Sequence, residues 1–333
     1  MTMRQSRVPA AAPHELRRDR LVDVLHAHAG RPLILLWAPA GFGKSTLAAG
    51  YARETEAAVA WLTLDGSHCN PRTLFGCIRE VFEEALDNPS CMPQLARGLT
   101  QGADGTGLAH LLVADLRQLG QRVILVLDDF QSVQGQKEDL QAVDLLLRHL
   151  PEHAQVVITA REPPPLSIER MFAHNTVFAL GADDLRFTSE ETAELRRLLG
   201  GDDSRDADAD GWVTGILLGG APHQLGVMGG TVLAGYVDRQ VLARLRKLEQ
   251  RWLETLAVLE TITPKAAEQL LGVGPWASRL ATLAERCPFL VAHTDRTYHL
   301  HGLVRESLSH ACVHAAQRRP TAPGRRHVTS RSM

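Results

Sequence analysis

With 333 residues, the chain is too long for one compact core, and its length predicts two or three domains. Its 44% hydrophobic and 22% charged residues are typical of an ordinary soluble globular protein. A formal net charge of −2 argues against a surface that binds nucleic acid through charge alone.

The N-terminal residues 1–14 carry positive charge but lack the apolar run of a signal peptide, and we expect them to be disordered. No apolar run in the chain approaches the roughly 18 residues of a membrane span. The five cysteines show neither CxxC pairing nor zinc-finger spacing, which indicates reduced thiols. We therefore expect a cytoplasmic protein that makes no membrane contact.

Five short apolar runs in the first 180 residues read as β-strands, and helical patterns lie between most of them. The runs are continuously apolar rather than alternating, as in strands that helices cover on both faces. An α/β domain built on a mostly parallel sheet is therefore expected over residues 15–182. The predicted strands are Leu33–Trp37, Val59–Leu64, Val123–Leu127, Gln155–Ala160 and Thr176–Leu180.

Beyond Leu180 the pattern becomes helical. Thr188 and Glu191 have the spacing of a capping box, which predicts that a helix starts there. The acidic stretch at 201–210 and the glycine-rich stretch at 218–230 are typical of loops. Residues 183–235 are therefore expected to form a helical lid.

Residues 236–314 predict a winged helix, because three helical patterns precede two short strand patterns around a polar turn. The expected helices are Tyr236–Leu259, Pro264–Leu271 and Trp276–Arg286, and the strand pair lies within 289–301. The last residues, 315–333, carry five arginines and no acid, and we expect a disordered basic tail.

The most informative motif follows the first predicted strand. Ala38 to Ser45 fits the phosphate loop G-x-x-x-x-G-K-[ST], with Ala38 in place of the first glycine. In such a loop, successive amides and the start of the next helix form an anion cradle, the Lys44 ammonium reaches the β and γ phosphates, and Ser45 ligates Mg²⁺. This predicts an ATP/ADP and Mg²⁺ site whose nucleotide-binding residues are Ala40, Gly41, Phe42, Gly43, Lys44, Ser45 and Thr46.

A pair of carboxylates ends the third predicted strand, in "VILVLDDF". Next to a phosphate loop, such a strand end suits the magnesium side of the site. Asp128 is predicted to hold Mg²⁺ directly or through water, and Asp129 to orient or deprotonate the attacking water. Arg161, at the end of the "QVVITAR" strand, is placed to meet a γ-phosphate, although a surface arginine at a strand end is the alternative.

The segments "APAGFGKSTL", "VAWLTLDGSHCNPRTLFGCI", "LVLDDF", "LLRHLPEHAQVVITAREPPPL", "LGADDLRFTSEET" and "DGWVTGILL" occur in this order. Together they resemble the signal-transduction ATPases with numerous domains (STAND), specifically the MalT-like large ATP-binding regulators of the LuxR type. The resemblance covers roughly residues 15 to 312. The superhelical repeats and C-terminal helix-turn-helix that usually follow in such regulators are not found in the sequence.

The resemblance implies that a P-loop domain, a lid and a winged helix close around ADP at rest, and that ATP opens the assembly and permits self-association. It also implies magnesium at Ser45 and Asp128 and γ-phosphate sensing by Arg161. His301, in "LHGLV", matches a winged-helix histidine that touches the phosphate of the bound nucleotide. A packed or solvated surface histidine is the alternative for His301.

The function indicated is therefore an ATP-binding switch that slowly hydrolyses ATP. Two alternatives remain at this stage. One is a DNA-binding regulator whose winged helix is the output, although the Trp276–Arg286 helix offers only two basic groups, Arg279 and Arg286, and sequence-specific DNA binding is not expected. The other is a truncated remnant that binds nucleotide without turnover.

Overall fold

The structure is a computed structural model that describes residues 7–200, 211–219, 235–239, 242–287, 289–293, 296–302, 304–305 and 308. By their contacts these residues fall into two compact units, residues 7–200 with 211–219 and the described residues from 235 onward. The predicted loop at 201–210, most of the glycine-rich stretch and the predicted basic tail lie outside the described residues. No helix in the described parts of the chain has the length and apolar character needed to cross a membrane.

The first unit is built on one five-stranded sheet in which all neighbouring strands are parallel. The predicted parallel sheet is confirmed, and the strand order is β2-β3-β4-β1-β5. The strands are β1 (Leu33–Trp37), β2 (Ala58–Thr63), β3 (Val123–Asp128), β4 (Ala154–Ala160) and β5 (Val177–Leu180).

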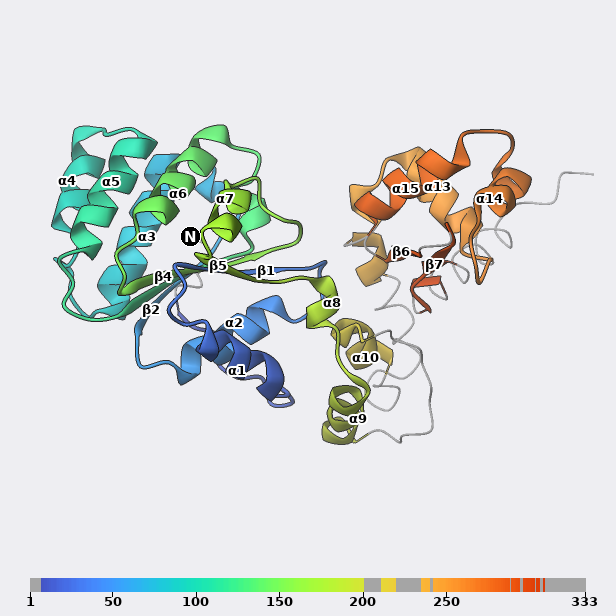
Figure 1. Cartoon of the computed structure of the whole chain (residues 1–333), viewed down its shortest axis with the longest axis horizontal. Helices are drawn as coiled ribbons and strands as arrows, with labels where there is room; N and C mark the ends of the chain where they lie inside the picture. The colour runs from blue at the N-terminus through green and yellow to red at the C-terminus, as the bar shows by residue number, and fades with distance from the viewer. Residues whose placement is uncertain are drawn as a thin grey trace, which may run out of the picture. The chain divides into compact units, whose positions relative to one another are not determined.

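Helices cover both faces of this sheet, with α1 and α2 on one face and α3, α5, α6 and α7 on the other (Figure 1). Strands covered on both faces in this way have little solvent-facing surface, which is why their sequences are mostly apolar. The helices are α1 (Asp19–Ala27), α2 (Lys44–Glu54), α3 (Pro71–Ala85), α4 (Pro93–Gln101), α5 (Gly105–Leu116), α6 (Lys137–His149), α7 (Ile168–Ala173), α8 (Ala182–Leu185), α9 (Ser189–Leu198) and α10 (Val213–Gly219).

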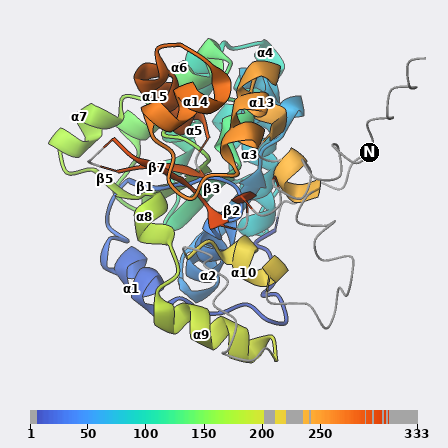
Figure 2. The same cartoon turned by 90° about the vertical axis from the view of Figure 1, so that its right-hand side faces the viewer.

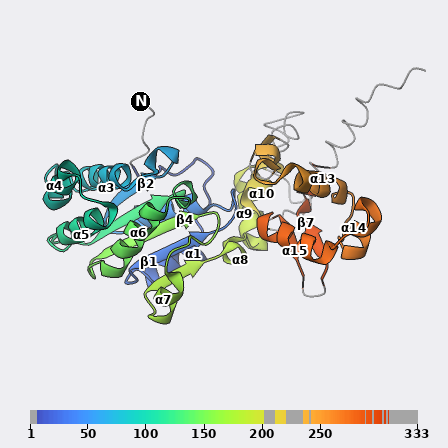
Figure 3. The same cartoon turned by 90° about the horizontal axis from the view of Figure 1, so that it is seen from above.

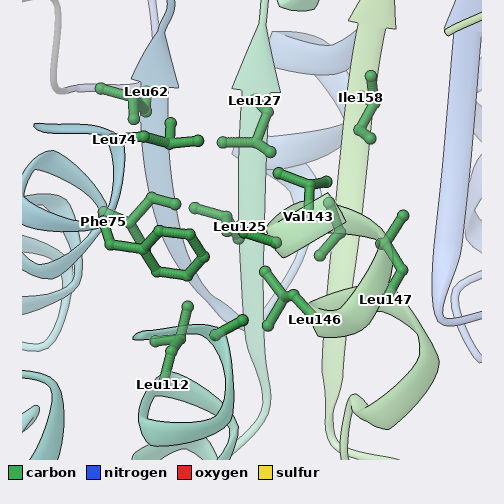
Figure 4. Close-up of a cluster of buried hydrophobic side chains, with 14 of the residues drawn as sticks. Leu62, Leu74, Phe75, Leu112, Leu125, Leu127, Val143, Leu146, Leu147 and Ile158 are labelled. Carbon is green, nitrogen blue, oxygen red and sulfur yellow. The ribbon is translucent and has the colours of Figure 1, made fainter. Parts of the chain in front are cut away.

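The main core lies between the sheet and helices α3, α5 and α6 (Figure 4). Phe75 of α3 and Leu112 of α5 pack there against Leu125 of β3, and all three side chains are buried. Burial of each such side chain stabilises the fold by about 1.5–3 kcal/mol. This packing fixes β3 and β4 beside β1, so that the carboxyl ends of these three strands lie at one edge of the sheet.

The capping box predicted at residue 188 is present at the start of α9. The Thr188 hydroxyl accepts a hydrogen bond from the Glu191 amide over 3.1 Å, and the Glu191 carboxylate accepts one from the Thr188 amide over 2.9 Å. Helices α8, α9 and α10 belong to the first unit, so the described part of the predicted lid packs with the P-loop domain.

Residues 7–14 differ from the predicted disorder at the N-terminus. They are placed against the first unit, where Arg7 pairs with Glu84 of α3 over 2.6 Å and Arg53 of α2 donates to the Pro9 carbonyl over 2.7 Å. Composition alone cannot register such contacts, because they involve partners distant in the sequence.

The second unit contains α13 (Lys247–Leu256), α14 (Pro264–Leu271) and α15 (Trp276–Arg286), together with the antiparallel pair β6 (Leu290–Ala292) and β7 (Tyr298–Leu300). Figure 3 shows the three helices gathered with this strand pair. Three helices followed by a two-stranded wing confirm the predicted winged helix.

One predicted helix, Tyr236–Leu259, is wrong in its extent. A 3₁₀ turn, Leu242–Arg244, precedes α13, which begins only at Lys247. The side-chain amide of Gln250 donates to the carbonyls of Leu242 and Leu245, and the Glu249 carboxylate accepts from the Arg246 amide. Side chains therefore satisfy backbone groups that a continuous helix would have paired with each other.

Candidate nucleotide-binding site

The predicted phosphate loop connects β1 to α2, as the motif requires. Gly41 and Gly43 have φ angles of 81° and 77°, a left-handed conformation that favours glycine. Gly43 is the N-cap of α2, and Thr46 lies in the first turn of that helix. Phe42, which lies between these two glycines in the sequence, is buried. The loop therefore brings several backbone amides and a helix N-terminus to one place.

Lys44 is buried at the start of α2, with 6% of its surface exposed. Its ammonium donates a hydrogen bond to the Pro39 carbonyl over 2.9 Å, which closes the loop on itself. Burial lowers the pKa of Lys44 to about 8, the negative charge of Asp129 opposes this shift, and the positive charge of Arg161 adds to it. A buried ammonium among loop amides is a site for a compact anion.

Asp128 is the last residue of β3 and is buried. Its Oδ1 accepts hydrogen bonds from the hydroxyls of Ser45 and Thr159, each over 2.6 Å. Burial raises the pKa of Asp128, while these two hydrogen bonds act in the opposite direction. The two predicted magnesium ligands, Ser45 and Asp128, thus lie in direct contact.

Asp129 follows in a left-handed conformation, with φ of 58°. Among residues other than glycine, aspartate tolerates this conformation comparatively well. Its amide donates to the Thr159 hydroxyl over 3.0 Å, and Gln131 donates to its Oδ1 over 2.7 Å. Arg161 lies just beyond β4, close enough for its charge to lower the pKa of Lys44.

These groups fit a nucleotide with Mg²⁺ in their chemistry. The loop supplies amides and an ammonium for phosphate oxygens, and Ser45 and Asp128 supply the oxygen ligands that Mg²⁺ prefers. Among the described residues no group of three or more His, Cys, Asp or Glu could hold a metal ion. Mg²⁺ at nucleotide sites does not need such a group, since it keeps waters and binds phosphates alongside one or two protein ligands.

His301 lies in the second unit, directly after β7. Its amide donates to the Phe289 carbonyl over 2.8 Å, and its ring meets the Phe289 ring edge-on with centroids 6.1 Å apart. The predicted contact between His301 and a nucleotide phosphate stays a prediction.

Sequence reasoning missed three residues at the site. Thr159 lies near the end of the predicted Gln155–Ala160 strand, and a hydroxyl at that place beside β3 was a usable signal. Trp212 donates through its indole to the Ala40 carbonyl over 3.3 Å, and the Thr214 amide donates to the Gly41 carbonyl over 3.1 Å. Nothing in a single sequence connects these two residues with a loop about 170 positions earlier.

Two models of known families match the chain in succession. The model described as "AAA ATPase domain" matches residues 15–159. The model described as "MalT winged helix domain" matches residues 238–320. The first match contains the phosphate loop and the Asp128 strand, and the second contains α13 to β7.

The curated relatives include a protein kinase and MalT regulators. The serine/threonine-protein kinase PknK of Mycobacterium tuberculosis is 29% identical over 300 residues, which cover 84% of this chain and 27% of that protein. The HTH-type transcriptional regulator MalT of Vibrio cholerae is 23% identical over 323 residues, covering 91% of this chain and 36% of the regulator. The chain therefore spans only about a third or less of the length of these relatives.

Among solved structures, a Walker-type ATPase of Pyrococcus abyssi is similar to this chain with a TM-score of 0.64 and 14% identity. The similarity covers 89% of this chain and 99% of that ATPase, and it shows the fold. The match to an AAA ATPase domain over the phosphate loop, followed by the match to a MalT winged helix domain, makes this chain similar to the MalT-like P-loop ATPases.

Proposed function

We propose that the chain is a nucleotide-controlled switch that binds ATP and ADP with Mg²⁺ and hydrolyses ATP slowly. It would be the nucleotide-binding part of a MalT-like transcriptional regulator, acting in the cytoplasm. The observation that carries the proposal is the hydrogen-bonded group of Ser45, Asp128 and Thr159 beside the buried Lys44 ammonium.

Binding would rest on groups that already lie together in the first unit. The Lys44 ammonium supplies a compact charge for the terminal phosphates, and the loop amides supply directed donors. When bound, Mg²⁺ would neutralise phosphate charge from a place beside Ser45 and Asp128. Charge-assisted hydrogen bonds of this kind are about twice as strong as neutral ones, which supports tight binding of a polyphosphate.

Turnover would depend on Asp129. Its carboxylate is the second one at the end of β3, and Gln131 holds one oxygen through a 2.7 Å hydrogen bond. The left-handed backbone at Asp129 is a local strain of the kind that clusters at functional sites. We propose that Asp129 orients the attacking water and accepts its proton, and that Arg161 stabilises the γ-phosphate charge.

The switch itself would consist of an ADP state at rest and an ATP state that self-associates. The first test is the nucleotide that remains bound to the purified protein. Retained ADP would support the resting state, and single-turnover hydrolysis of radiolabelled ATP would measure the slow reaction. A chain that binds neither nucleotide in a calorimetric titration with Mg²⁺ would contradict the proposal. Binding of ATP without any hydrolysis would favour the alternative that the chain is a truncated remnant that only binds nucleotide.

The rival function, sequence-specific DNA binding by the winged helix, receives little support from α15. The Arg279 guanidinium lies over the rings of Trp252 and Trp276, at 5.2 and 4.9 Å from their centroids. Arg286 forms an ion pair with Glu249. Besides Arg286, the exposed side chains described on this helix are small or hydroxylic: Ala277, Ser278, Ala281 and Thr282.

Both basic groups of the helix are thus engaged within the second unit, and base edges are usually read by arginine, lysine or amide side chains. We therefore expect no sequence-specific DNA binding by this chain. A footprint on one DNA sequence that persists at about 200 mM salt would promote the rival function, since binding by charge alone weakens steeply with salt.

A further inference from the structure

A short segment at the start of α10, Gly211 to Thr214, lies against the phosphate loop; we call it the strap. The indole N–H of Trp212 donates to the Ala40 carbonyl over 3.3 Å. The Gly41 carbonyl accepts two hydrogen bonds from Thr214, one from its amide and one from its hydroxyl, each over 3.1 Å. Figure 2 shows α10 beside α2, the helix that the loop enters.

The strap and the loop are also in close van der Waals contact. A Cβ atom added at Gly41 would lie 2.4 Å from the Thr214 hydroxyl and 2.7 Å from the Trp212 indole nitrogen. At Gly43 an added Cβ would be 3.7 Å from Val213. Gly41 is therefore required twice, once for its positive φ and once for the close approach of the strap.

The carbonyls that the strap binds belong to peptide units of the predicted phosphate cradle. In a planar trans peptide unit, the C=O and the following N–H point in opposite directions. A donor that holds the Ala40 carbonyl therefore also orients the Gly41 amide. In the same way, the two hydrogen bonds from Thr214 to the Gly41 carbonyl orient the Phe42 amide.

The strap is also held by residues outside the loop. Gly211 has a φ of 69°, and its carbonyl accepts a hydrogen bond from the Phe187 amide over 2.9 Å. The Phe187 ring is covered by the Arg18 guanidinium at 4.2 Å from the ring centroid. Arg18 is buried and pairs with Glu191, the acid of the α9 capping box. The strap thus contacts both the loop and a cluster formed by Arg18, Phe187 and Glu191.

We propose that Trp212 and Thr214 are positioning residues for nucleotide binding. They hold the outer carbonyls of the phosphate loop, and this keeps the Gly41 and Phe42 amides directed at the phosphates. The inference rests on the nucleotide binding proposed above and adds residues that touch the loop rather than the nucleotide. Without the strap, these two peptide units lose the hydrogen bonds to their carbonyls, and each amide is less often directed at a phosphate oxygen.

The test compares substitutions of two buried tryptophans whose indole N–H groups each donate a hydrogen bond. Trp212→Phe removes the donor to Ala40 and keeps an aromatic ring. Trp61→Phe is the matched control, because Trp61 is equally buried and donates to Thr63 over 3.0 Å in β2, with two strands between β2 and β1. Calorimetric titration with ADP, without Mg²⁺, isolates the loop from the metal site, and the thermal midpoint without nucleotide reports the fold.

Loss of one oriented hydrogen bond is expected to raise the dissociation constant of ADP about three- to ten-fold in Trp212→Phe. Trp61→Phe is expected to lower the thermal midpoint and leave ADP affinity within about two-fold of wild type. An unchanged ADP affinity in Trp212→Phe overturns the inference while the proposed function stands. A wild-type chain that does not bind ADP overturns both.

A second pair of variants keeps the inference testable if Trp212→Phe fails to fold. Thr214→Val removes the hydroxyl donor to Gly41 at almost constant volume, and Thr214→Ser retains it. We expect Thr214→Val to weaken ADP binding about two- to three-fold, because the Thr214 amide still serves the same carbonyl, and Thr214→Ser to restore the affinity. Equal affinities in both variants and wild type would exclude a positioning role for the hydroxyl.

Discussion

The Ser45 hydroxyl donates a 2.6 Å hydrogen bond to Oδ1 of Asp128, which joins the first turn of α2 to the end of β3. Thr159 donates to the same oxygen from β4. Three elements that are far apart in the sequence therefore meet at one carboxylate. In the proposed site, the same Ser45 and Asp128 oxygens would serve Mg²⁺, so the metal dependence of ATP binding reports on this contact.

The first prediction concerns this metal dependence. Asp128→Asn removes one negative charge and keeps an oxygen that can accept a hydrogen bond. We expect ATP affinity in Mg²⁺ to fall about ten-fold, or about 1.4 kcal/mol, with ADP affinity in EDTA little changed. Asp115→Asn is the control, because Asp115 is also buried but binds the Gln94 and Leu95 amides. If Asp128→Asn weakens nucleotide binding equally with and without Mg²⁺, Asp128 has no role in binding the metal.

A second prediction tests the ammonium of the phosphate loop. Lys44→Ala is expected to abolish tight nucleotide binding and to leave the fold intact, because the loop glycines and the core under the sheet are unchanged. Lys137→Ala is the control, since Lys137 is an exposed lysine at the start of α6. Titration with ATP and Mg²⁺ measures the affinity, and circular dichroism checks the fold. Wild-type affinity in Lys44→Ala would exclude the loop as the phosphate site.

The third prediction follows from the pKa of Lys44, which burial lowers from 10.5 to about 8. Above pH 8 the nucleotide-free protein loses this proton, whereas a bound phosphate favours the charged form and raises the pKa. ADP binding should therefore take up a proton at pH 8.5–9.5, and the affinity should fall by up to about ten-fold per pH unit in this window.

Calorimetry in two buffers of different ionisation enthalpy measures this proton uptake directly. Arg161 provides a comparison, because its positive charge lowers the pKa of Lys44. The substitution Arg161→Gln should raise that pKa and move the onset of proton uptake to higher pH. Heats that do not depend on the buffer across this pH range would show that Lys44 stays charged in the free protein.

The fourth prediction separates hydrolysis from binding. Asp129→Asn should retain ATP and slow hydrolysis by roughly 10²–10⁴-fold, the range typical for the loss of a general base. Gln131→Ala removes the hydrogen bond to the Asp129 carboxylate and should cause a smaller loss of rate. Single-turnover measurements with ATP in excess Mg²⁺ give both rates. If Asp129→Asn hydrolyses ATP as fast as wild type, the base lies elsewhere.

Much of the first unit was predictable because its sequence pattern is local. Each of the five strands is mostly apolar, and parallel strands covered on both faces favour that composition. The meeting of Ser45 with Asp128 was also predictable, since the carboxyl ends of parallel strands share one edge of the sheet. The motif fixed the positions of the two glycines with positive φ for the same local reason.

The remaining features depend on partners that are distant in the sequence or on side-chain capping. The contact of Trp212 with the Ala40 carbonyl joins residues 172 positions apart. The start of α13 depends on Gln250 and Glu249, which satisfy backbone groups before the helix. Hydrophobic periodicity continues through that break, so the pattern predicted one helix where the described residues form a helical stretch at 235–239, a 3₁₀ turn and the shorter helix α13.

His301 carries the proposed link between nucleotide state and the winged helix. Within the second unit its ring meets Phe289, and its carbonyl accepts a hydrogen bond from the Arg305 amide over 2.9 Å. The family resemblance implies that this histidine touches the phosphate of bound ADP. A single hydrogen bond made in the ADP state and lost in the ATP state would stabilise the closed form by about 1–3 kcal/mol.

The last prediction is that His301→Ala releases ADP about five- to hundred-fold faster than wild type, because about 1–3 kcal/mol of closed-state stabilisation is lost. The same substitution should weaken ATP binding less than ADP binding and favour the self-associating form. His299→Ala is the matched control, because His299 lies two residues earlier on β7 and is exposed. Stopped-flow release of a fluorescent ADP and sedimentation velocity in each nucleotide measure the two effects. If His301→Ala only lowers the thermal midpoint, with ADP release and association like those of His299→Ala, then His301 is a packing residue of the winged helix.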